Sequence, residues 1–180
     1  MRIDEPDSFT YLIRESATGH EVPAAFVPLQ YVDLNTIAAE NWHGVFKPIW
    51  EQIAETEPLR KRAYKIVCDD TDKRTQGLLF LGIERGRDWS LDCLLEAAPW
   101  NRHGAGDRLY RGVGKALIAR IIAEHWRLGY HSPIQLEVNP RSHLFYQRLG
   151  FVQAGEASAS NRLFLPEAQA RTIFESVVVP

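Results

Sequence analysis

The chain has 180 residues, of which 45% are hydrophobic and 24% are charged, and its formal net charge is −2. This length suits one well-cored domain and is short for two, so we expect residues 1–180 to form a single domain, with residues 1–8 as a loose polar arm. The absence of a net positive charge argues against a nucleic acid or an anionic membrane as partner and favours a small molecule or a peptide.

The cysteines, the histidines and the N-terminal residues argue against a disulfide, a metal site and a membrane or secretion segment. Cys68 and Cys93 both lie in apolar, strand-like stretches, which predicts buried free thiols rather than a disulfide. The six histidines form none of the spacings typical of metal sites, so we expect no metal. The chain begins without an apolar signal core, and no run reaches the ~20 apolar residues of a membrane span. We therefore expect a cytoplasmic protein.

The N-terminal third shows one strand followed by helices. Residues 9–14 alternate in hydrophobicity, which predicts a strand, and residues 19–23 contain the glycine and proline of a turn or loop. Between residue 33 and about residue 55 the apolar side chains recur at helical spacing. One or two amphipathic helices are predicted there, with a break or a start at Pro48.

Three strands follow in close succession. Residues 63–68, 77–83 and 89–97 are predicted strands, and short polar turns separate them. Such short connections favour an antiparallel meander.

The second half alternates helices and strands. Apolar residues from Val113 to Leu128 fall on one broad face of a helix that Gly129 can end. A strand over 134–138 and a helix with Asn139 as its cap follow. A strand pair over 151–157 and 162–165, and a helix from about Pro166, complete the chain. The predicted fold class is mixed α/β of the α+β type, with one central, mostly antiparallel sheet flanked by helices.

The segment Arg111-Gly112-Val113-Gly114-Lys115 opens the long helix after the third strand of the meander. Glycines let backbone N–H groups turn toward a phosphate, and the helix N-terminus adds a favourable field. Arg111 or Lys115 could add a charged contact. By itself the pattern also fits a helix whose glycines serve packing. A Walker loop is excluded, and a dinucleotide loop would need a third glycine where Leu117 stands.

A second segment, residues 139–151, favours the phosphate-binding interpretation over the packing one. It follows a strand and forms a short helix that ends in Gly-Phe. Together the two segments resemble the GNAT superfamily of acetyltransferases over residues 62–155. Gly112 and Gly114 match the two loop glycines of the family. The residues that match its second motif are Asn139, Ser142, Phe145, Tyr146, Gly150 and Phe151.

Two departures from the family pattern stand out. Leu109 occupies the place of the leading Gln or Arg of the loop, although Arg108 is adjacent. An insert over residues 100–107, rich in Arg, His and Gly, pushes the glycines beyond their usual distance from the strand. We expect this insert to shape a pocket or to cover the cofactor.

The resemblance implies acetyl-CoA as co-substrate and assigns its contacts. The end of the strand would carry a bulge within residues 94–97 and offer amides to the thioester and the pantetheine arm. The implied cofactor-binding residues are Leu95, Glu96, Ala97, Arg111, Gly112, Val113, Gly114, Lys115, Asn139 and Tyr146.

The resemblance also suggests catalytic residues. Tyr146 matches the tyrosine beside the thioester sulfur, where its hydroxyl could protonate the leaving thiolate; the alternative is that Tyr146 only packs between helix and sheet. Glu96 is the best general base, and Asp92, His103 or a chain of water molecules are alternatives.

Aromatic residues mark the region where the acceptor pocket is expected. Trp42, Phe46 and Trp50 fit a helical core and could also line that pocket, and Trp100 stands at the start of the insert.

The predicted function is therefore transfer of an acetyl or other acyl group from acetyl-CoA to an amine of a small molecule or peptide. One alternative is a non-catalytic acyl-CoA-binding or regulatory domain of the same fold. Another is an unrelated α/β phosphate-binding protein, such as a nucleotide enzyme. The resemblance is compatible with a homodimer, and no sequence feature identifies the acceptor.

Overall fold

The computed structural model describes residues 8–40, 42, 50–53, 62–68, 74–84, 90–102, 106–129, 133–153 and 162–179. The predictions made for residues 1–7, Phe46, Pro48, His103 and the side chain of Asp92 lie outside this description.

A main sheet of seven strands dominates the described part of the chain. Its strands are β1 (Thr10–Glu15), β2 (Glu21–Pro28), β3 (Ala63–Cys68), β4 (Thr75–Glu84), β5 (Ser90–Ala97), β6 (Tyr110–Arg111) and β10 (Val178–Val179). Their order is β10-β1-β2-β3-β4-β5, and β6 also pairs with β1. Each pair is antiparallel, so the predicted meander is confirmed.

A smaller sheet of three strands contains β7 (Ile134–Glu137), β8 (Val152–Gln153) and β9 (Arg162–Leu165) in the order β7-β9-β8. The predicted fold class, mixed α/β with a mostly antiparallel sheet flanked by helices, is confirmed. The hydrogen bonding differs in one respect, because it divides the strands into two sheets rather than joining them in one.

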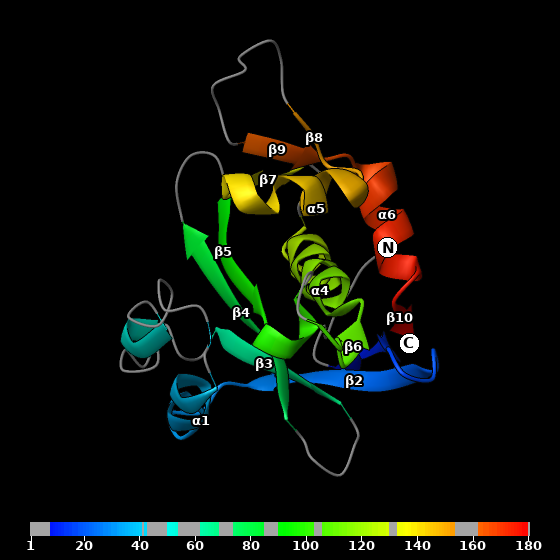
Figure 1. The fold of residues 1–180 in the computed structure, drawn as a ribbon. Coiled ribbons are helices and arrows are strands. Elements are labelled where there is room, and N and C mark those ends of the chain that lie inside the picture. The colour runs from blue at the N-terminus through cyan, green and yellow to red at the C-terminus, as the bar shows by residue number, and fades with distance from the viewer. Residues whose placement is uncertain are drawn as a thin grey trace.

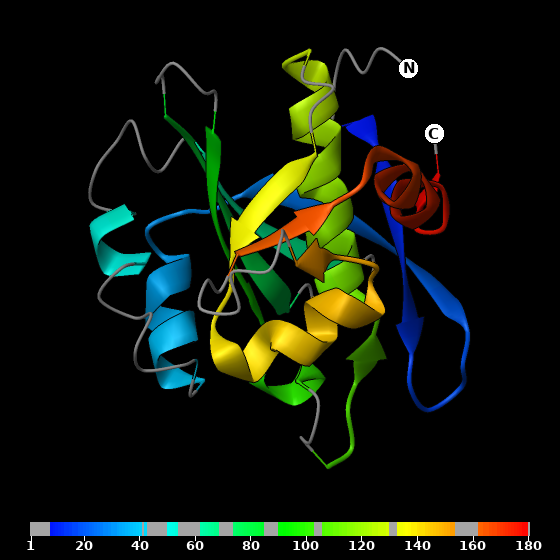
Figure 2. The ribbon, with the colours of Figure 1, turned by 90° about the horizontal axis from the view of Figure 1, so that it is seen from above.

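The described helical segments flank these sheets. They are α1 (Asp33–Ala39), η2 (Pro99–Asn101), α4 (Val113–Arg127), η3 (Pro140–Ser142), α5 (His143–Arg148) and α6 (Glu167–Glu175). Helix α4 runs through the middle of the molecule, and α1 lies across the main sheet from it (Figures 1 and 2). None of the helices in the described residues is long and apolar enough to cross a membrane.

Two apolar clusters cover the two faces of β5. Cys93, Leu95 and Ala97 pack against the larger cluster, which joins the main sheet, α4, α6 and the smaller sheet. Leu94 and Ala98 belong to the second cluster, which contains Trp42, Trp50 and Ile37 of α1. Because side chains alternate along a strand, the Glu96 side chain lies on the face of the second cluster. Cys68 is buried and Cys93 is partly buried, and both are free thiols, as predicted.

Strand β2 was not predicted, because Pro23 suggests a loop. Pro23 lies opposite Leu12 of β1, and the Leu12 N–H donates to Val177 O at 2.7 Å on the other side of β1. The missing N–H of Pro23 therefore faces β3, where pairing begins one residue later, at Ala24 with Cys68. No ladder hydrogen bond is lost, so the strand tolerates the proline.

Gly77 allows β4 to pack closely against its neighbours. A Cβ atom at this position would lie 3.1 Å from the Glu96 carbonyl oxygen, 3.1 Å from Val113 Cγ1 and 3.2 Å from Ile66 Cγ2. The end of β5 and the start of α4 are therefore held within van der Waals reach of the same residue.

We expect Gly77→Val to lower the free energy of unfolding by about 1–3 kcal/mol, because the added methyl groups overpack this contact. Urea denaturation measures the change. Gly106→Ala is the control: a Cβ there meets nothing within 4 Å, so its effect should stay within about 0.5 kcal/mol. Equal stability of the two variants would contradict the packing role.

Candidate functional site

The end of β5 presents backbone groups that β4 does not use. The Ala98 N–H donates to Gln76 O at 2.9 Å, so even-numbered residues of β5 bond to β4 in this antiparallel ladder. Leu95 and Ala97 therefore direct their peptide groups away from β4. The Ala97 carbonyl confirms this direction, because it accepts from Arg102 Nε at 3.1 Å. Within the described residues, no strand pairs with this edge of β5.

The predicted bulge within residues 94–97 is wrong. Pairing of β5 with β4 stays in register from Ser90 to Ala97. The irregularity lies instead in β4, which gains one residue, Gln76, between its pairs with Ile66 and Val67 of β3. The extra residue breaks the pairing of β4 with β3 and leaves that of β4 with β5 intact.

The start of α4 carries backbone donors without acceptors in the helix. Gly112 precedes the helix with φ 86°, a left-handed conformation that favours glycine, and no side chain caps this end. The first helical hydrogen bond runs from Ala116 N–H to Gly112 O at 2.9 Å. The N–H groups of residues 113–115 therefore have no partner within the helix. The Val113 side chain is buried in the core, so only its backbone can contact a ligand.

Helix α5 lies against the first turn of α4. A Cβ atom on Gly114 would lie 2.8 Å from Cζ of the Phe145 ring. Gly114 of the first segment and Phe145 of the second, which are 31 residues apart in the sequence, are thus in contact.

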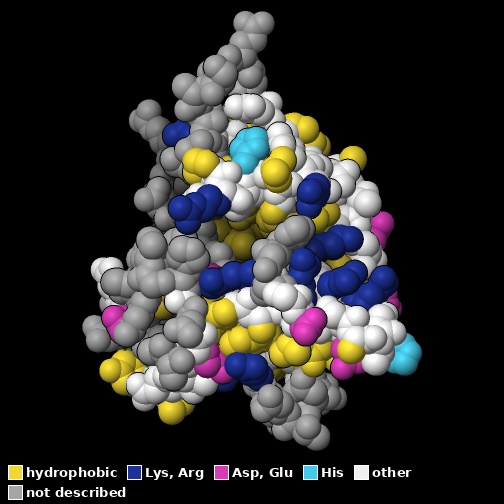
Figure 3. Space-filling view, in the orientation of Figure 1, with side chains coloured by type: hydrophobic (Ala, Val, Ile, Leu, Met, Phe, Trp, Pro, Cys, Tyr) yellow, Lys and Arg dark blue, Asp and Glu magenta, His cyan; other side chains and the backbone are white. Residues whose placement is uncertain are grey.

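Basic side chains gather on this face of the molecule. Figure 3 shows Lys and Arg side chains around a recess with a hydrophobic floor, on the face that carries α5, β6 and the start of α4. The basic residues of these elements and of the adjoining segments are Arg108, Arg111, Lys115, Arg141 and Arg148, none of which takes part in an ion pair within the described chain. The local field therefore favours an anion, although the whole chain is slightly acidic.

Asn139 caps its helix, as predicted. Its Oδ1 accepts from the Arg141 N–H at 2.9 Å, and its backbone carbonyl accepts from Ser142 Oγ at 2.9 Å. The residue is exposed, so its Nδ2 can donate to a ligand while Oδ1 serves as the cap.

Tyr146 is buried beside the open edge of β5. Its ring packs at 5.0 Å from Phe145 and 5.3 Å from Phe151 between ring centroids. Burial raises the pKa of the Tyr146 hydroxyl from 10.0 to about 12, and the nearby Cys93 thiol of β5 contributes in the same direction. The phenol therefore keeps its proton at neutral pH and is a hydrogen-bond donor.

Glu96 lies on the opposite face of β5 and is already engaged. Its carboxylate accepts from Trp50 Nε1 at 3.2 Å and from Arg102 Nη2 at 2.5 Å. Only 6% of its side chain is exposed, against 30% for Arg102. Tyr146 interacts with Cys93 of β5, which packs against the larger cluster, so Tyr146 and Glu96 lie on opposite faces of this strand.

Three residues of this region were not singled out as site residues from the sequence. Arg102 and Asn101 lie in or beside the insert, whose composition indicated a role, while Gln76 gave no signal. Trp100, which was expected near the ligand, donates from Nε1 to Gln76 Oε1 at 3.0 Å. Arg74 covers its ring at 3.3 Å from the centroid, and Trp42 packs edge-on at 6.1 Å. Trp100 is therefore fixed at the junction of β4 and the insert.

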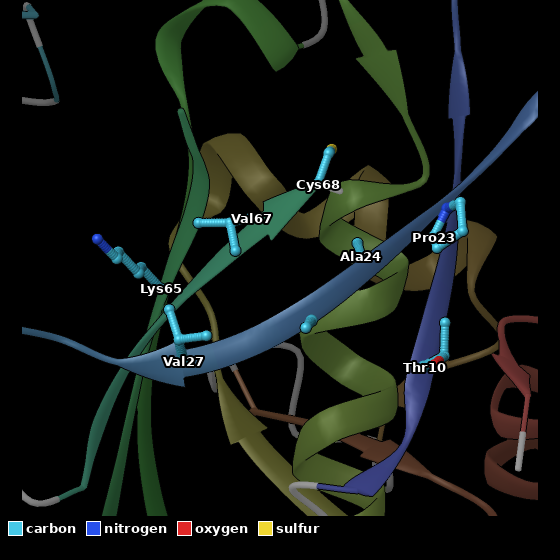
Figure 4. Close-up of a pocket in the computed structure, with 8 residues that line it drawn as sticks. Thr10, Pro23, Ala24, Val27, Lys65, Val67 and Cys68 are labelled. Carbon is cyan, nitrogen blue, oxygen red and sulfur yellow. The ribbon is translucent and has the colours of Figure 1, made fainter. Parts of the chain in front are cut away.

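Two hollows, each of about 450 Å³, lie on the described surface. The first, on β2 and β3, is lined by small apolar residues and Lys65 (Figure 4). Lys65, the one charged residue among the described residues that line this hollow, is paired with Asp33 at 2.7 Å. The second lies between the end of β1 and residues 106–111, next to the loop before α4. No cluster of three or more potential metal ligands occurs among the described residues.

Comparison with known proteins supports the fold assignment. No protein-family model and no curated protein sequence matches the chain. Among solved structures, AtaTR bound with acetyl-CoA matches with a TM-score of 0.56 and 18% identity, over 84% of this chain and 98% of that one. A chimera of the spermidine N-acetyltransferase SpeG from Vibrio cholerae and hSSAT matches with a TM-score of 0.53 and 20% identity, over 83% and 98%. The chain has the GNAT fold, as the two motifs predicted.

The raised pKa of Tyr146 makes stability depend on pH. The unfolded chain loses the phenol proton near pH 10 and the folded chain near pH 12. The stability that the neutral phenol contributes is therefore fully present below pH 10 and is lost as the pH rises to 12, by up to about 3 kcal/mol. We expect Tyr146→Phe to lack this loss in urea denaturation. Parallel stability curves of the variant and the wild type over this range would contradict the assignment.

Proposed function

Because the chain has the GNAT fold, we propose that it is an acyl-CoA N-acyltransferase that passes an acetyl group from acetyl-CoA to an amine. One observation carries the proposal: the open edge of β5, the uncapped start of α4, and α5 with Tyr146 meet at one place. Gly77 contacts both β5 and α4, Gly114 contacts Phe145 of α5, and Tyr146 interacts with Cys93 of β5. An anion site, a row of backbone groups and a phenolic hydrogen-bond donor are therefore adjacent.

The cofactor would bind along this junction. Its pyrophosphate suits the three N–H groups at the start of α4, with Arg111 and Lys115 near enough in sequence to add charge. Its amide-containing arm suits the peptide groups of Leu95 and the N–H of Ala97 on the free edge of β5, and the Nδ2 of Asn139. The solved AtaTR structure with a similar fold is bound with acetyl-CoA, which supports the choice of ligand.

The chemistry follows from the groups that flank this edge. The acceptor nitrogen attacks the thioester carbonyl carbon, the C–S bond breaks, and the thiolate leaves. A thiol has a pKa near ~8.5, well below the value of about 12 for Tyr146, so full proton transfer from the phenol is unfavourable. Tyr146 instead donates a hydrogen bond that stabilises the thiolate as it forms. The proton of the new ammonium passes to Glu96 or to water.

The acceptor side lies across β5 from Tyr146. Glu96, Arg102 and the indole of Trp50 are in contact there, and Trp42 and Trp100 pack nearby. An amine of a small molecule or a peptide is the proposed acceptor, and the SpeG chimera with a similar fold derives from a spermidine N-acetyltransferase. We propose that residues 1–180 act as one domain in this reaction.

A second candidate is a non-catalytic acyl-CoA-binding domain. The state of Glu96 favours it, because a carboxylate that already accepts from a guanidinium and an indole has little capacity left for the proton of the acceptor. Binding of CoA without turnover of any amine would select this alternative.

Gly114→Glu should weaken binding of CoA at least roughly 100-fold, about 2.7 kcal/mol, because its carboxylate repels the pyrophosphate and its side chain displaces Phe145. Isothermal titration calorimetry with CoA measures the change. Thr172→Glu adds the same charge at an exposed position of α6, outside the proposed site, and should bind nearly as the wild type does. Failure of the wild type to bind CoA would refute the proposed function.

Glu96→Gln and Arg102→Gln together test the general base. If Glu96 accepts the proton, Glu96→Gln lowers kcat by about 100-fold or more, while Arg102→Gln keeps the carboxylate and lowers kcat less than about tenfold. Steady-state kinetics with free-thiol detection measures both. Equal losses in the two variants would show that Glu96 serves only as the partner of Arg102.

A further inference from the structure

The connection from β5 to α4, residues 98–112, contains the loop of the proposed phosphate site. Such a long connection has to be fixed by specific contacts if its last residues are to present an ordered anion site. Its second described part is attached to the main sheet, because β6 pairs with β1 and the Ser16 N–H donates to Leu109 O at 2.8 Å. Its first part, η2, follows directly on β5. One side chain links the two parts.

Asn101 is that side chain. It is 7% exposed, and its Oδ1 accepts from the Tyr110 N–H at 2.9 Å, one residue before Arg111. Its Nδ2 donates to Gln76 Oε1 at 2.8 Å and to Gln76 O at 3.2 Å. A backbone contact between Leu109 N–H and Trp100 O at 3.2 Å lies beside these bonds. The donor end of the amide thus faces β4, and its acceptor end faces the loop before α4.

Gln76 in turn is held in one orientation. It is 1% exposed, and its Oε1 accepts from both Asn101 and Trp100, while its Nε2 donates to Arg74 O at 3.0 Å. Gln76 is the extra residue of the β4 bulge, and its carbonyl also accepts from the Ala98 N–H at the end of β5. The bulge therefore contacts the end of β5 directly and the loop before α4 through Asn101.

We propose that Asn101 is a positioning residue for acyl-CoA binding: with the Gln76 bulge, it fixes the loop of residues 109–112 relative to the free edge of β5. This inference rests on the proposed function, since it supposes that both parts contact one ligand. Asn101 itself touches neither the reacting atoms nor the proposed anion site. Its effect passes through the Tyr110 N–H to Arg111 and Gly112.

The chemistry of the side chain explains why an amide is needed. Only Asn or Gln offers an acceptor and a two-hydrogen donor on one short planar group, and Asn matches the spacing here. An aspartate would place a carboxylate against two oxygens of Gln76. An alanine would leave the partly buried Tyr110 N–H and the oxygens of the buried Gln76 without this partner.

The test compares Asn101→Ala with Ile173→Val in the full chain. Ile173 is buried in α6, so its variant loses core packing without touching the insert. Hydrogen exchange of backbone amides reports the order of the loop, and calorimetry reports the affinity for CoA. In Asn101→Ala we expect exchange at residues 109–111 and at Arg14 and Ser16 of the facing strand end to rise about tenfold, and the Kd for CoA to rise about tenfold. In Ile173→Val we expect neither faster exchange in the loop nor a higher Kd for CoA.

The outcomes separate the possible explanations. Exchange that rises equally in α6 and β7, or a loop that exchanges faster while the Kd for CoA is unchanged, would overturn the positioning role. If the wild type does not bind CoA, the proposed function fails, while the exchange pattern still decides whether Asn101 holds the loop. Asn101→Asp is the second variant if the alanine variant does not fold, and the same pattern is expected of it.

Discussion

The close approach of β4 to β5 and α4 at Gly77 sets the geometry on which the candidate site depends. Because Gly77 has no side chain, both the Glu96 carbonyl of β5 and the Val113 side chain of α4 can pack directly against it. The free edge of β5 and the N–H groups of α4 are thereby fixed relative to each other through the core. Packing of this kind is stiff, because protein interiors have few voids to absorb a displacement. The adjacent Gln76 bulge then extends the same constraint to the insert.

Tyr146 and Glu96 are both buried, on opposite faces of β5, but their surroundings differ. Tyr146 is surrounded by Phe145, Phe151 and the core, which favours its neutral form and raises its pKa. Glu96 is similarly buried, and its carboxylate accepts hydrogen bonds from a guanidinium and an indole. A neutral donor therefore lies on one face of β5, and a carboxylate paired with a cation lies on the other. An uncharged thioester and a neutral amine are suited to such surroundings.

The local structure that could be predicted from the sequence is found where the backbone requires a particular residue type. Gly112 adopts a positive φ at the start of a helix, and Asn139 caps a turn that begins with proline. Both requirements act within three or four residues, so a short pattern reveals them. The fold class followed because each helix and strand of the core keeps its own periodicity.

The features that the sequence did not predict depend on contacts between residues that are far apart in the sequence. Asn101 and Gln76 are 25 positions apart and meet only once the bulge in β4 has formed. Strand β10 has two residues and exists because β1 offers it a partner. Pro23 gave the signal of a loop, and only the register against β1 and β3 shows why a strand accepts it. The expected bulge in β5 was placed one strand away from its true position for the same reason.

Arg102 has a consequence beyond the pairing with Glu96. A strand edge with unpaired peptide groups is a template on which a second chain can add a strand, and such addition leads to aggregation. The Nε of Arg102 occupies the carbonyl of Ala97, the last residue of β5, and its charge stands at the end of that edge. A foreign strand would have to displace a hydrogen-bonded cation to continue the ladder. The cation at the end of β5 therefore hinders the addition of a strand from another molecule.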